Sequence, residues 1–485
     1  MSPVDTILTA LAVPLIGAVL IAAAHRAPNV RETITLVTAT ALFLLVASLL
    51  PEVAAAGRPA VTLFEVMPGL ALKFEVEPLG MLFALVASVL WIVTSVYSIG
   101  YMRGNEEENQ TRYYVCFAGA LASAIGIAFA GNLFTLFLFY EALTLITYPL
   151  VAHHGTAEAM HGGRVYLGVL LTTSIVFLLT VIIWTWSVAG TLDFVPGGIL
   201  EGKVEGPVVG IMLALYMFGI GKAALMPFHR WLPAAMVAPA PVSALLHAVA
   251  VVKAGVFSVM KVAVYVFGVD LLSSETSTDW LAYVAAFTIL AASIVALRQD
   301  NLKRRLAYST VSQLSYVVLG AALANAAGVI GGTLQIAMHA CAKITLFFCA
   351  GAIYTAIHKN DVSELDGMGK VMPFTFAAYT VAALSVIGLP PLGGAWSKFF
   401  LINGAVDAGT LLMVAVLIAS SLLNVAYLLT PALRAFFLPA KDTHYAGKVH
   451  EAPLACVAPL CATAAGCVLL FFFAQPIFDF VALLV

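Results

Sequence analysis

Apolar stretches about as long as a lipid bilayer is thick recur along the whole chain. A hydrocarbon core about 30 Å thick is crossed by a helix of about 20 apolar residues. Fourteen such stretches follow one another, at residues 4–24, 34–50, 79–99, 113–130, 133–151, 163–189, 208–226, 242–267, 280–297, 308–325, 328–355, 372–389, 410–433 and 453–474. Charged residues make up only 10% of the chain, against about 25% in soluble domains. The sequence therefore predicts an all-α integral membrane protein, a single polytopic domain over residues 1–485 with about 14 transmembrane helices.

Basic residues are divided unevenly between the connecting loops. When the N-terminus is placed outside, the outside loops hold only Arg58, Lys73 and Lys203. The inside loops hold fifteen basic residues, namely Arg26, Arg31, Arg103, Arg112, Arg164, Arg230, Arg298, Lys303, Arg304, Arg305, Lys359, Lys370, Arg434, Lys441 and Lys448. Because cytoplasmic loops are enriched in Lys and Arg, we expect both termini outside. The first stretch lacks a small-residue cleavage site, so we expect a spanning helix there and not a removed signal peptide.

Charged side chains also fall inside the predicted spans. Glu141 lies within one span, and five lysines lie within or beside others, namely Lys222, Lys253, Lys261, Lys343 and Lys398. A charge at the centre of a transmembrane helix costs at least about 2.5–3.5 kcal/mol, so these side chains are expected to be paired or used. Lys261 lies near the end of its span, where a long side chain can reach the headgroup region. We expect Lys261 to snorkel in this way.

Two spans are interrupted by proline and glycine, and each interruption has a lysine beside it. Lys222 precedes the first and Lys398 follows the second, 176 residues later. The interrupting residues are Pro227, Pro233, Pro239 and Pro241 in the first, and Pro390, Pro391, Gly393 and Gly394 in the second. Broken helices at membrane depth are tolerated where protein or a wet cavity satisfies the freed backbone groups. Paired breaks in two halves are typical of inverted-repeat transporters. We predict two inverted five-helix repeats, at about residues 113–267 and 280–433.

Motifs for cofactors and metals are missing from the sequence. The six cysteines all lie in apolar segments without CxxC or Cys/His clustering, which favours packing roles over iron–sulfur, haem or zinc sites. No glycine-rich phosphate loop lies between a strand and a helix, and the net charge of −2 gives no nucleic-acid signal. His153, His154 and His161 are expected to be solvated in a loop. We therefore expect no cofactor, no metal and no redox chemistry in this chain.

Three segments together resemble one family, the antiporter-like membrane subunits of Mrp-type cation/proton antiporters, respiratory complex I and membrane-bound hydrogenases. The first runs from Lys222 to Lys253 and includes His229, Trp231, Pro241, Ser243 and His247. The second is DNLKRRLAYSTVSQLSY and the third is HACAKITLFFCAGAIY. The likeness covers nearly the whole chain and is strongest from about residue 130 to 400. The D subunit of an Mrp-type antiporter is the member that the chain resembles most.

The resemblance implies a role in proton transfer for particular residues. Carried over position by position, the family's central residues are Glu141, Lys222, Lys253, Lys398, His339 and Lys343. Glu77 stands where many members have aspartate, which keeps the carboxylate.

Proton transfer through a membrane needs groups that lose and regain a proton. Burial disfavours the charged form of a lysine, and a nearby carboxylate favours it, so a Glu141–Lys222 pair could switch Lys222 between holding and releasing a proton. His247 and His339 are suited as relays because histidine titrates near neutral pH. Lys343 shares a helix face with His339. On another predicted helix, Ser309, Ser312 and Gln313 share a face that could hold water.

Three functions follow from the resemblance and remain open at this point. The first is the proton-translocating subunit of a multisubunit sodium/proton antiporter. The second is a proton-pumping membrane subunit of a complex I-like NADH–quinone oxidoreductase or of a hydrogenase. The third is the membrane partner of a proton-driven inorganic-carbon uptake complex. Each implies a multi-pass protein of the bacterial inner (plasma) membrane, with other membrane subunits, including related antiporter-like ones, as partners.

Overall fold

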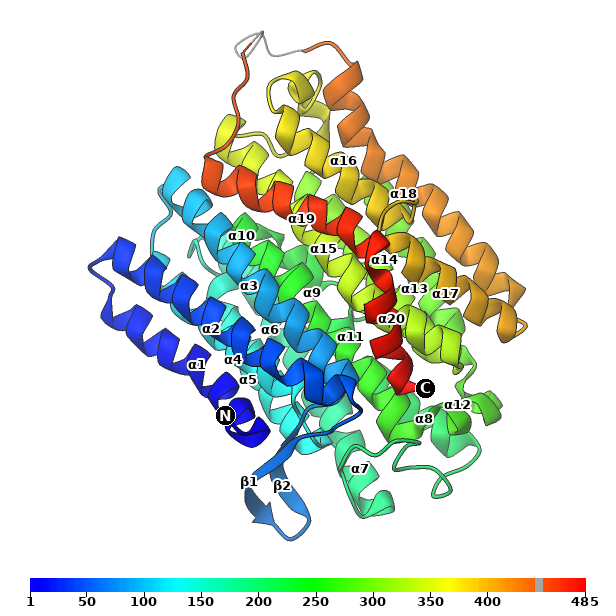
Figure 1. Cartoon of the computed structure of the whole chain (residues 1–485). Helices are drawn as coiled ribbons and strands as arrows, with labels where there is room; N and C mark the ends of the chain where they lie inside the picture. Colours follow the sequence, from blue (N-terminus) through cyan, green and yellow to red (C-terminus); the bar gives the residue numbers. More distant parts are fainter. Residues whose placement is uncertain (441–447) are drawn as a thin grey trace.

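The computed structural model describes residues 1–440 and 448–485, so Lys441 of the predicted inside loops lies outside the described residues. Helices make up nearly all of the fold. Figure 1 shows them as one bundle, with both chain ends at the same end of the helices. Among the described residues, eleven helices are long and apolar enough to cross a membrane.

The N-terminal part combines four long helices with one hairpin. Its helices are α1 (Pro3–Ala23), α2 (Pro28–Ala54), α3 (Pro78–Gly104) and α4 (Gln110–Ala128). Proline occupies the first helical position of α1, α2 and α3, where its missing N–H would have no partner in any case. Glu77 caps α3 by accepting hydrogen bonds from the backbone of Leu79 and Gly80, both at 2.8 Å.

An antiparallel hairpin lies between α2 and α3, where the sequence indicated only a polar connection. Strands β1 (Ala60–Met67) and β2 (Leu70–Glu75) pair from Ala60↔Glu75 to Met67↔Leu70. Gly69 has a φ of +81°, which glycine adopts without strain. The hairpin extends beyond the helices at the end that holds the termini (Figure 1). There the Lys73 ammonium lies 2.9 Å from the Asp193 carboxylate. Desolvation would lower the Lys73 pKa, but the contacts with Asp193 and Glu75 outweigh it and raise this pKa.

The segment that follows α4, which holds most of the first predicted repeat, contains irregular helices. Its α-helices are α5 (Leu133–Val151), α6 (Ala157–Thr173), α7 (Thr180–Ala189), α8 (Pro207–Gly219), α9 (Trp231–Ala234), α10 (Ala240–Ala244), α11 (Val251–Lys261) and α12 (Val269–Ser274). Wide π-helical turns join α6 to α7, α10 to α11 and α11 to α12, at Ser174–Leu179, Leu245–Val249 and Val262–Phe267. Such turns are frequent at functional sites.

The second predicted repeat and the C-terminal part contain longer helices. These are α13 (Trp280–Arg298), α14 (Leu302–Ala322), α15 (Ala326–Ile357), α16 (Pro373–Ile387), α17 (Gly394–Asp407), α18 (Leu411–Phe437), α19 (Leu454–Phe472) and α20 (Ala474–Val481). Single 3₁₀ turns lie at Gly221–Ala223, Ala235–Val237, Thr276–Thr278, Val362–Glu364, Met368–Lys370 and Ala482–Leu484. The 32-residue α15 is almost entirely buried and packs against α10, α14, α16, α17 and α19.

Helices lie in all fourteen predicted ranges, but only eleven helices of the described residues are long and apolar enough to cross a membrane, so the number of fourteen spans stays a prediction. The two predicted breaks are present. The α8 helix ends at Gly219, three residues before Lys222, and α16 ends at Ile387 before α17 restarts at Gly394. The freed backbone groups find partners inside the protein. The Trp231 indole donates to the Gly221 carbonyl at 2.9 Å, and the Gly393 N–H donates to the Cys467 carbonyl at 2.9 Å. These breaks confirm the broken-helix part of the predicted fold.

Loops rich in basic residues gather at the end of the bundle opposite the hairpin. Arg103 forms an ion pair with Glu32, and Arg112 donates to the His153 carbonyl at 2.7 Å. These contacts tie the start of α2, the α3–α4 connection and the α5–α6 connection together. The predicted inside loops therefore share one end of the molecule, which we call the basic end. The side of the membrane that this end faces remains a prediction.

A row of buried polar side chains

Lys222 lies at the break after α8, fully buried against α5. Its ammonium donates to the Tyr140 carbonyl at 2.8 Å and to the Thr144 hydroxyl at 2.6 Å. Its backbone N–H donates to the Tyr140 phenol at 3.1 Å. Gly255 of α11 lies against the Lys222 carbonyl, so closely that a Cβ at this glycine would lie 2.7 Å from the carbonyl oxygen. The break thus places a lysine in the protein interior with only neutral hydrogen-bond partners.

Glu141 lies next to this site but does not bind Lys222. Both of its carboxylate oxygens are buried and have no hydrogen-bond partner. No ion pair within 4.0 Å involves Glu141 among the described residues. Glu141 follows Tyr140 and precedes Thr144 by three residues on α5, so it shares a helix with both groups that hold the ammonium. The predicted direct pair is absent from this structure, although the two charges are neighbours.

Lys253 and His339 are joined directly. The Lys253 ammonium lies 2.8 Å from His339 Nδ1, linking α11 to α15, and both side chains are buried. The other ring nitrogen of His339, Nε2, has no partner. A histidine nitrogen that faces an ammonium must accept the hydrogen bond, which leaves the proton of a neutral ring on the opposite nitrogen. In this pair the Lys253 ammonium donates to Nδ1 of His339, and the N–H at Nε2 of His339 is left without a partner.

His247 lies near this pair without any hydrogen bond. It belongs to the π-helical turn after α10, is fully buried, and packs on the Phe347 ring at 4.5 Å between ring centroids. Neither ring nitrogen has a partner. Buried polar groups are usually satisfied by protein or by an ordered water molecule, so His247 marks a place where water is expected.

Lys343 continues the row on α15, one turn after His339. Its ammonium donates to the Ser309 hydroxyl at 2.6 Å. The Tyr427 phenol donates to the same hydroxyl at 3.1 Å and also bonds to Asn424. Ser309 thereby connects α14, α15 and α18.

A second branch of the row reaches Lys398. The Gln335 amide donates to Gln313 at 2.8 Å and accepts from Ser397 at 2.6 Å, which ties α14, α15 and α17 together. The neighbouring Lys398 ammonium donates to the Ile387 carbonyl at 2.7 Å and to the Ser421 hydroxyl at 2.8 Å. Lys398 thus binds a carbonyl that the end of α16 leaves free.

Ser312 does not face the same neighbours as Ser309 and Gln313. Its hydroxyl lies 3.0 Å from Ser293 of α13, and Ser293 lies 3.4 Å from Ser420 of α18. Ser309 and Gln313 therefore contact α15, whereas Ser312 contacts α13. The three residues predicted to share one face of α14 do not all face the same neighbour.

The complete row uses residues that sequence reasoning missed. Gln335, His339 and Lys343 lie four residues apart on α15, so they form a polar stripe along a buried helix. Tyr140, Thr144, Gln335 and Ser397 had not been singled out. The regular spacing of Gln335 before His339 was a usable signal, whereas the partners on other helices carry no local signal.

The prediction that Lys261 snorkels is wrong. Its side chain is only 1% exposed, and its ammonium lies 2.8 Å from the Glu77 carboxylate. Tyr265 donates to the other Glu77 oxygen at 2.7 Å. Because the π-helical turn after Lys261 prolongs the helix beyond it, the side chain remains inside the protein, where only a carboxylate partner compensates its charge.

Breaking this buried pair should destabilise the protein strongly. Glu77→Ala leaves Lys261 without its carboxylate, and loss of one partner of a buried ion pair costs about 3–5 kcal/mol. Denaturant unfolding in detergent measures the change. Glu75→Gln is the control, because its contacts with Arg58 and Lys73 are longer and partly exposed and pairs of that kind contribute about 1 kcal/mol or less. Equal losses of unfolding free energy in both variants would contradict a stabilising ion pair between Glu77 and Lys261.

The histidine loop also differs from its prediction. His153 is 4% exposed and not solvated, and burial lowers its pKa. His154 lies 3.2 Å from a Glu107 carboxylate oxygen, and this hydrogen bond raises the His154 pKa. His161 is exposed as expected. In the part of the chain that the structure describes, no group of three or more His, Cys, Asp or Glu side chains is arranged to hold a metal ion.

The sequence matches the profile of the NADH:quinone oxidoreductase/Mrp antiporter transmembrane family over residues 130–424. Among curated proteins, the N subunit of the NADH-quinone oxidoreductase of Desulforudis audaxviator is 36% identical over 74% of this chain and 72% of its own length. A probable K(+)/H(+) antiporter A/B subunit of Rhizobium meliloti is 30% identical, and the match covers 75% of this chain but 36% of that protein. The A subunit of the Na(+)/H(+) antiporter of Alkalihalophilus pseudofirmus is 29% identical over 80% of this chain and 51% of its own length.

Two solved structures share the fold over almost their whole length. A chain of the Mrp complex from Dietzia sp. DQ12-45-1b superposes with a TM-score of 0.88 at 22% identity, covering 100% of this chain and 97% of that one. A chain of the membrane-bound sulfane sulfur reductase, an archaeal respiratory membrane complex, gives a TM-score of 0.85 at 25% identity, covering 99% and 96%.

Proposed function

This chain belongs to the NADH:quinone oxidoreductase/Mrp antiporter membrane family, and from that premise we propose that it is the proton-translocating subunit of a multisubunit sodium/proton antiporter. The observation that carries the proposal is the row of buried amines and imidazoles along α15. Likeness to antiporter subunits of Rhizobium meliloti and Alkalihalophilus pseudofirmus supports the choice of a cation antiporter.

The hydrogen bonds of the four lysines support proton transfer over a purely structural role. Among the described residues, no ion pair within 4.0 Å involves Lys222, Lys253, Lys343 or Lys398. Each is held by hydroxyl, carbonyl or imidazole groups instead. Such partners accept a hydrogen bond from a lysine whether the amine is charged or neutral, so either protonation state can be accommodated. Lys261 differs from these four because its carboxylate partner fixes its charge.

Glu141 is the proposed control element for Lys222. Its free carboxylate shares a helix with the groups that hold the ammonium, so a small displacement of either side chain would bring the charges together. A closer carboxylate favours the charged lysine, and a more distant one favours release of the proton. The driving change would come from cation movement in neighbouring subunits, which we propose as partners in the same membrane complex.

The membrane setting forms part of the proposal. We place the basic end in the cytoplasm of a bacterium and the hairpin end, with both termini, outside the inner membrane. The excess of Lys and Arg in the loops of the basic end supports this orientation.

A second candidate is a proton-pumping subunit of a redox-driven complex. The 36% identity with the N subunit of an NADH-quinone oxidoreductase, over 72% of that protein, favours it. The buried row would serve both functions, because only the energy source differs.

Ion flux in the purified complex tests the proposal. With the complex reconstituted in vesicles, an imposed sodium gradient should drive proton movement, recorded with a pH-sensitive dye. Glu141→Gln should remove most of this flux, because the amide carries no charge, whereas Glu141→Asp should keep part of it. Proton movement that depends on quinone reduction and ignores the sodium gradient would overturn the antiporter proposal in favour of the second candidate.

A further inference from the structure

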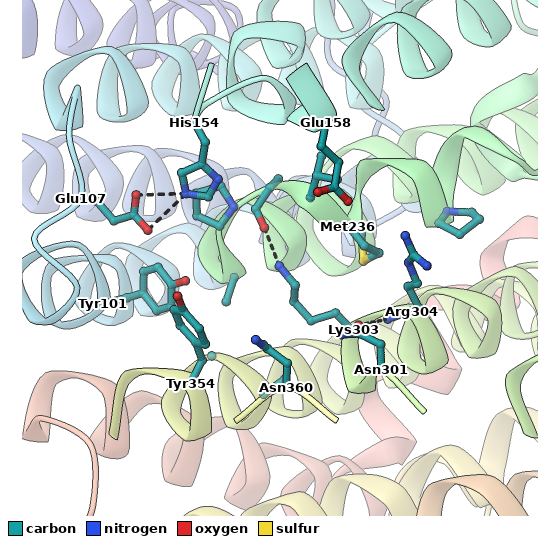
Figure 2. A pocket seen from close by; sticks show the side chains of 17 residues that line it. Tyr101, Glu107, His154, Glu158, Met236, Asn301, Lys303, Arg304, Tyr354 and Asn360 are labelled. Carbon is teal, nitrogen blue, oxygen red and sulfur yellow. Dashed lines mark hydrogen bonds and ion pairs between the residues drawn. The ribbon is translucent and has the colours of Figure 1, made fainter. Parts of the chain in front are cut away.

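A cavity of about 330 Å³ opens at the basic end of the bundle. Figure 2 shows side chains from several separate segments around it, including Glu107, His154, Lys303 and Tyr354. A larger cavity of about 620 Å³ is lined by several of the same residues. Lys303 is one of the basic residues of the predicted inside loops. Its ammonium lines the smaller cavity and donates to the Ala238 carbonyl at 2.6 Å.

The cavity wall continues towards the buried row. Ala240, the first residue of α10, and Gly351 of α15 both line it. Ser243 lies three residues farther along α10, and His247 follows in the π-helical turn. On α15, Phe347 packs on His247 one turn from Gly351, and one turn of helix rises about 5.4 Å. The cavity and His247 are therefore separated by about one turn of α15.

Three buried polar atoms without partners lie along this short distance. They are the Ser243 hydroxyl and both ring nitrogens of His247. Ser243 and His247 are fully buried, and a buried hydroxyl without a hydrogen-bond partner is unfavourable. Water molecules with two to four polar partners satisfy such groups in protein interiors.

The wall between the cavity and these atoms is thin and tightly packed. A Cβ added to Gly351 would lie 2.2 Å from the Tyr97 phenol oxygen and 2.5 Å from the Ala240 methyl group. This packing of α15 against α3 and α10 leaves no room for a hydrated sodium ion.

We propose that Glu107 and His154 form a proton-collecting site at the cavity mouth, and that the unpaired Ser243 hydroxyl holds a water molecule through which protons reach His247. His154 receives a proton from bulk water, and Glu107 holds the charged ring. The proton then passes through water at Ser243 to His247, whose two free nitrogens can accept it on one side and release it on the other towards the Lys253–His339 pair. The inference rests on the proposed proton translocation and adds residues to its pathway.

Charged and titratable groups surround His154 from every packed segment. They are Glu106, Glu107 and Glu108 from the α3–α4 connection, Tyr101 of α3, His153 beside His154, Glu158 of α6, Lys303 and Arg304 of α14, Tyr354 of α15 and His358 after it. Glu107 forms the hydrogen bond and raises the His154 pKa. Proton uptake should fall as pH at this end rises through the His154 pKa. Glu107→Gln removes the charge that raises the pKa, so the fall should move to lower pH.

Ser243→Ala gives the sharpest test. It removes an unpaired buried hydroxyl, so the melting temperature of the complex should stay unchanged or rise, while proton flux in reconstituted vesicles should fall at least about tenfold. Ser243→Thr keeps the hydroxyl and should recover most of the flux. His154→Gln should flatten the pH dependence. His161→Gln is the matched control, because this histidine is exposed on the neighbouring helix and lines neither cavity.

The outcomes separate this inference from the proposed function. If the parent complex transports protons, Lys222→Ala does not, and Ser243→Ala transports at the parental rate, then the uptake route is wrong and the proposed function stands. The route is also wrong if Ser243→Thr is as slow as Ser243→Ala at an unchanged melting temperature, or if His161→Gln shifts the pH profile as much as His154→Gln. A parent complex without proton flux overturns both proposals.

Discussion

Replacing Lys222 by alanine should abolish proton transport and leave the fold of the complex intact. The substitution removes the amine that donates to the Tyr140 carbonyl and the Thr144 hydroxyl. The break in the helix should survive, because Trp231 and the backbone N–H of residue 222 hold it and neither depends on the lysine side chain. Proton flux in reconstituted vesicles, measured beside the melting temperature, separates lost transport from lost folding.

Lys222→Arg sharpens the test. Arginine keeps the positive charge but does not release its proton at accessible pH. If Lys222 works by passing protons, Lys222→Arg should be as inactive as Lys222→Ala. If Lys222 only supplies a fixed charge, Lys222→Arg should retain transport. Normal flux through either variant contradicts the central assignment.

Lys398→Ala should block transport to a similar degree, because Lys398 occupies the corresponding place at the second break. Its ammonium binds the Ile387 carbonyl at the end of α16 and the Ser421 hydroxyl. We expect Lys398→Glu to be milder, since a carboxylate also holds and releases a proton. Proton flux through the reconstituted complex, measured for both variants and the parent, tests this expectation. A Lys398→Ala complex that transports protons at the parental rate would contradict a role of Lys398 in proton transfer.

The repeat boundaries at 113–267 and 280–433 remain predictions, and thiol accessibility tests their inverted relation. Thr144→Cys and Ser421→Cys place thiols within hydrogen-bond distance of the two lysine ammonium groups. With the six native cysteines first replaced, impermeant reagents should reach the two positions preferentially from opposite sides of the membrane. Labelling of both from one side would contradict inverted repeats.

The properties that sequence predicted well are local ones. Spans follow from runs of apolar residues, and the breaks follow from proline and glycine, whose effects on the helix act within one turn. The buried lysines were recognisable because a charge in an apolar run is costly wherever its partner lies. The fold class and the presence of buried lysines therefore needed no tertiary information.

The partner of each buried charged side chain could not be predicted in the same way. Lys261 looked free to reach the headgroups, and its pairing with Glu77 depends on how α3 packs against α11. Glu141 and Lys222 were expected to meet, yet the ammonium bonds to groups one and three residues away from the carboxylate. The hairpin was missed although Pro68 and Gly69 lie between residues with strand preference, which is a recognisable turn signal.

The polar stripe on α15 limits how many protons the row can hold at one time. His339 and Lys343 are four residues apart, so their side chains begin about 5–6 Å from each other. Two positive charges at about 6 Å repel by about 3 kcal/mol at an effective dielectric constant of about 20, which lowers double occupancy about a hundredfold. Among the described residues, no ion pair within 4.0 Å involves Lys343, so no carboxylate in direct contact offsets that repulsion. Each arriving charge would therefore expel the one ahead of it, and the current through the row should saturate as the driving force grows.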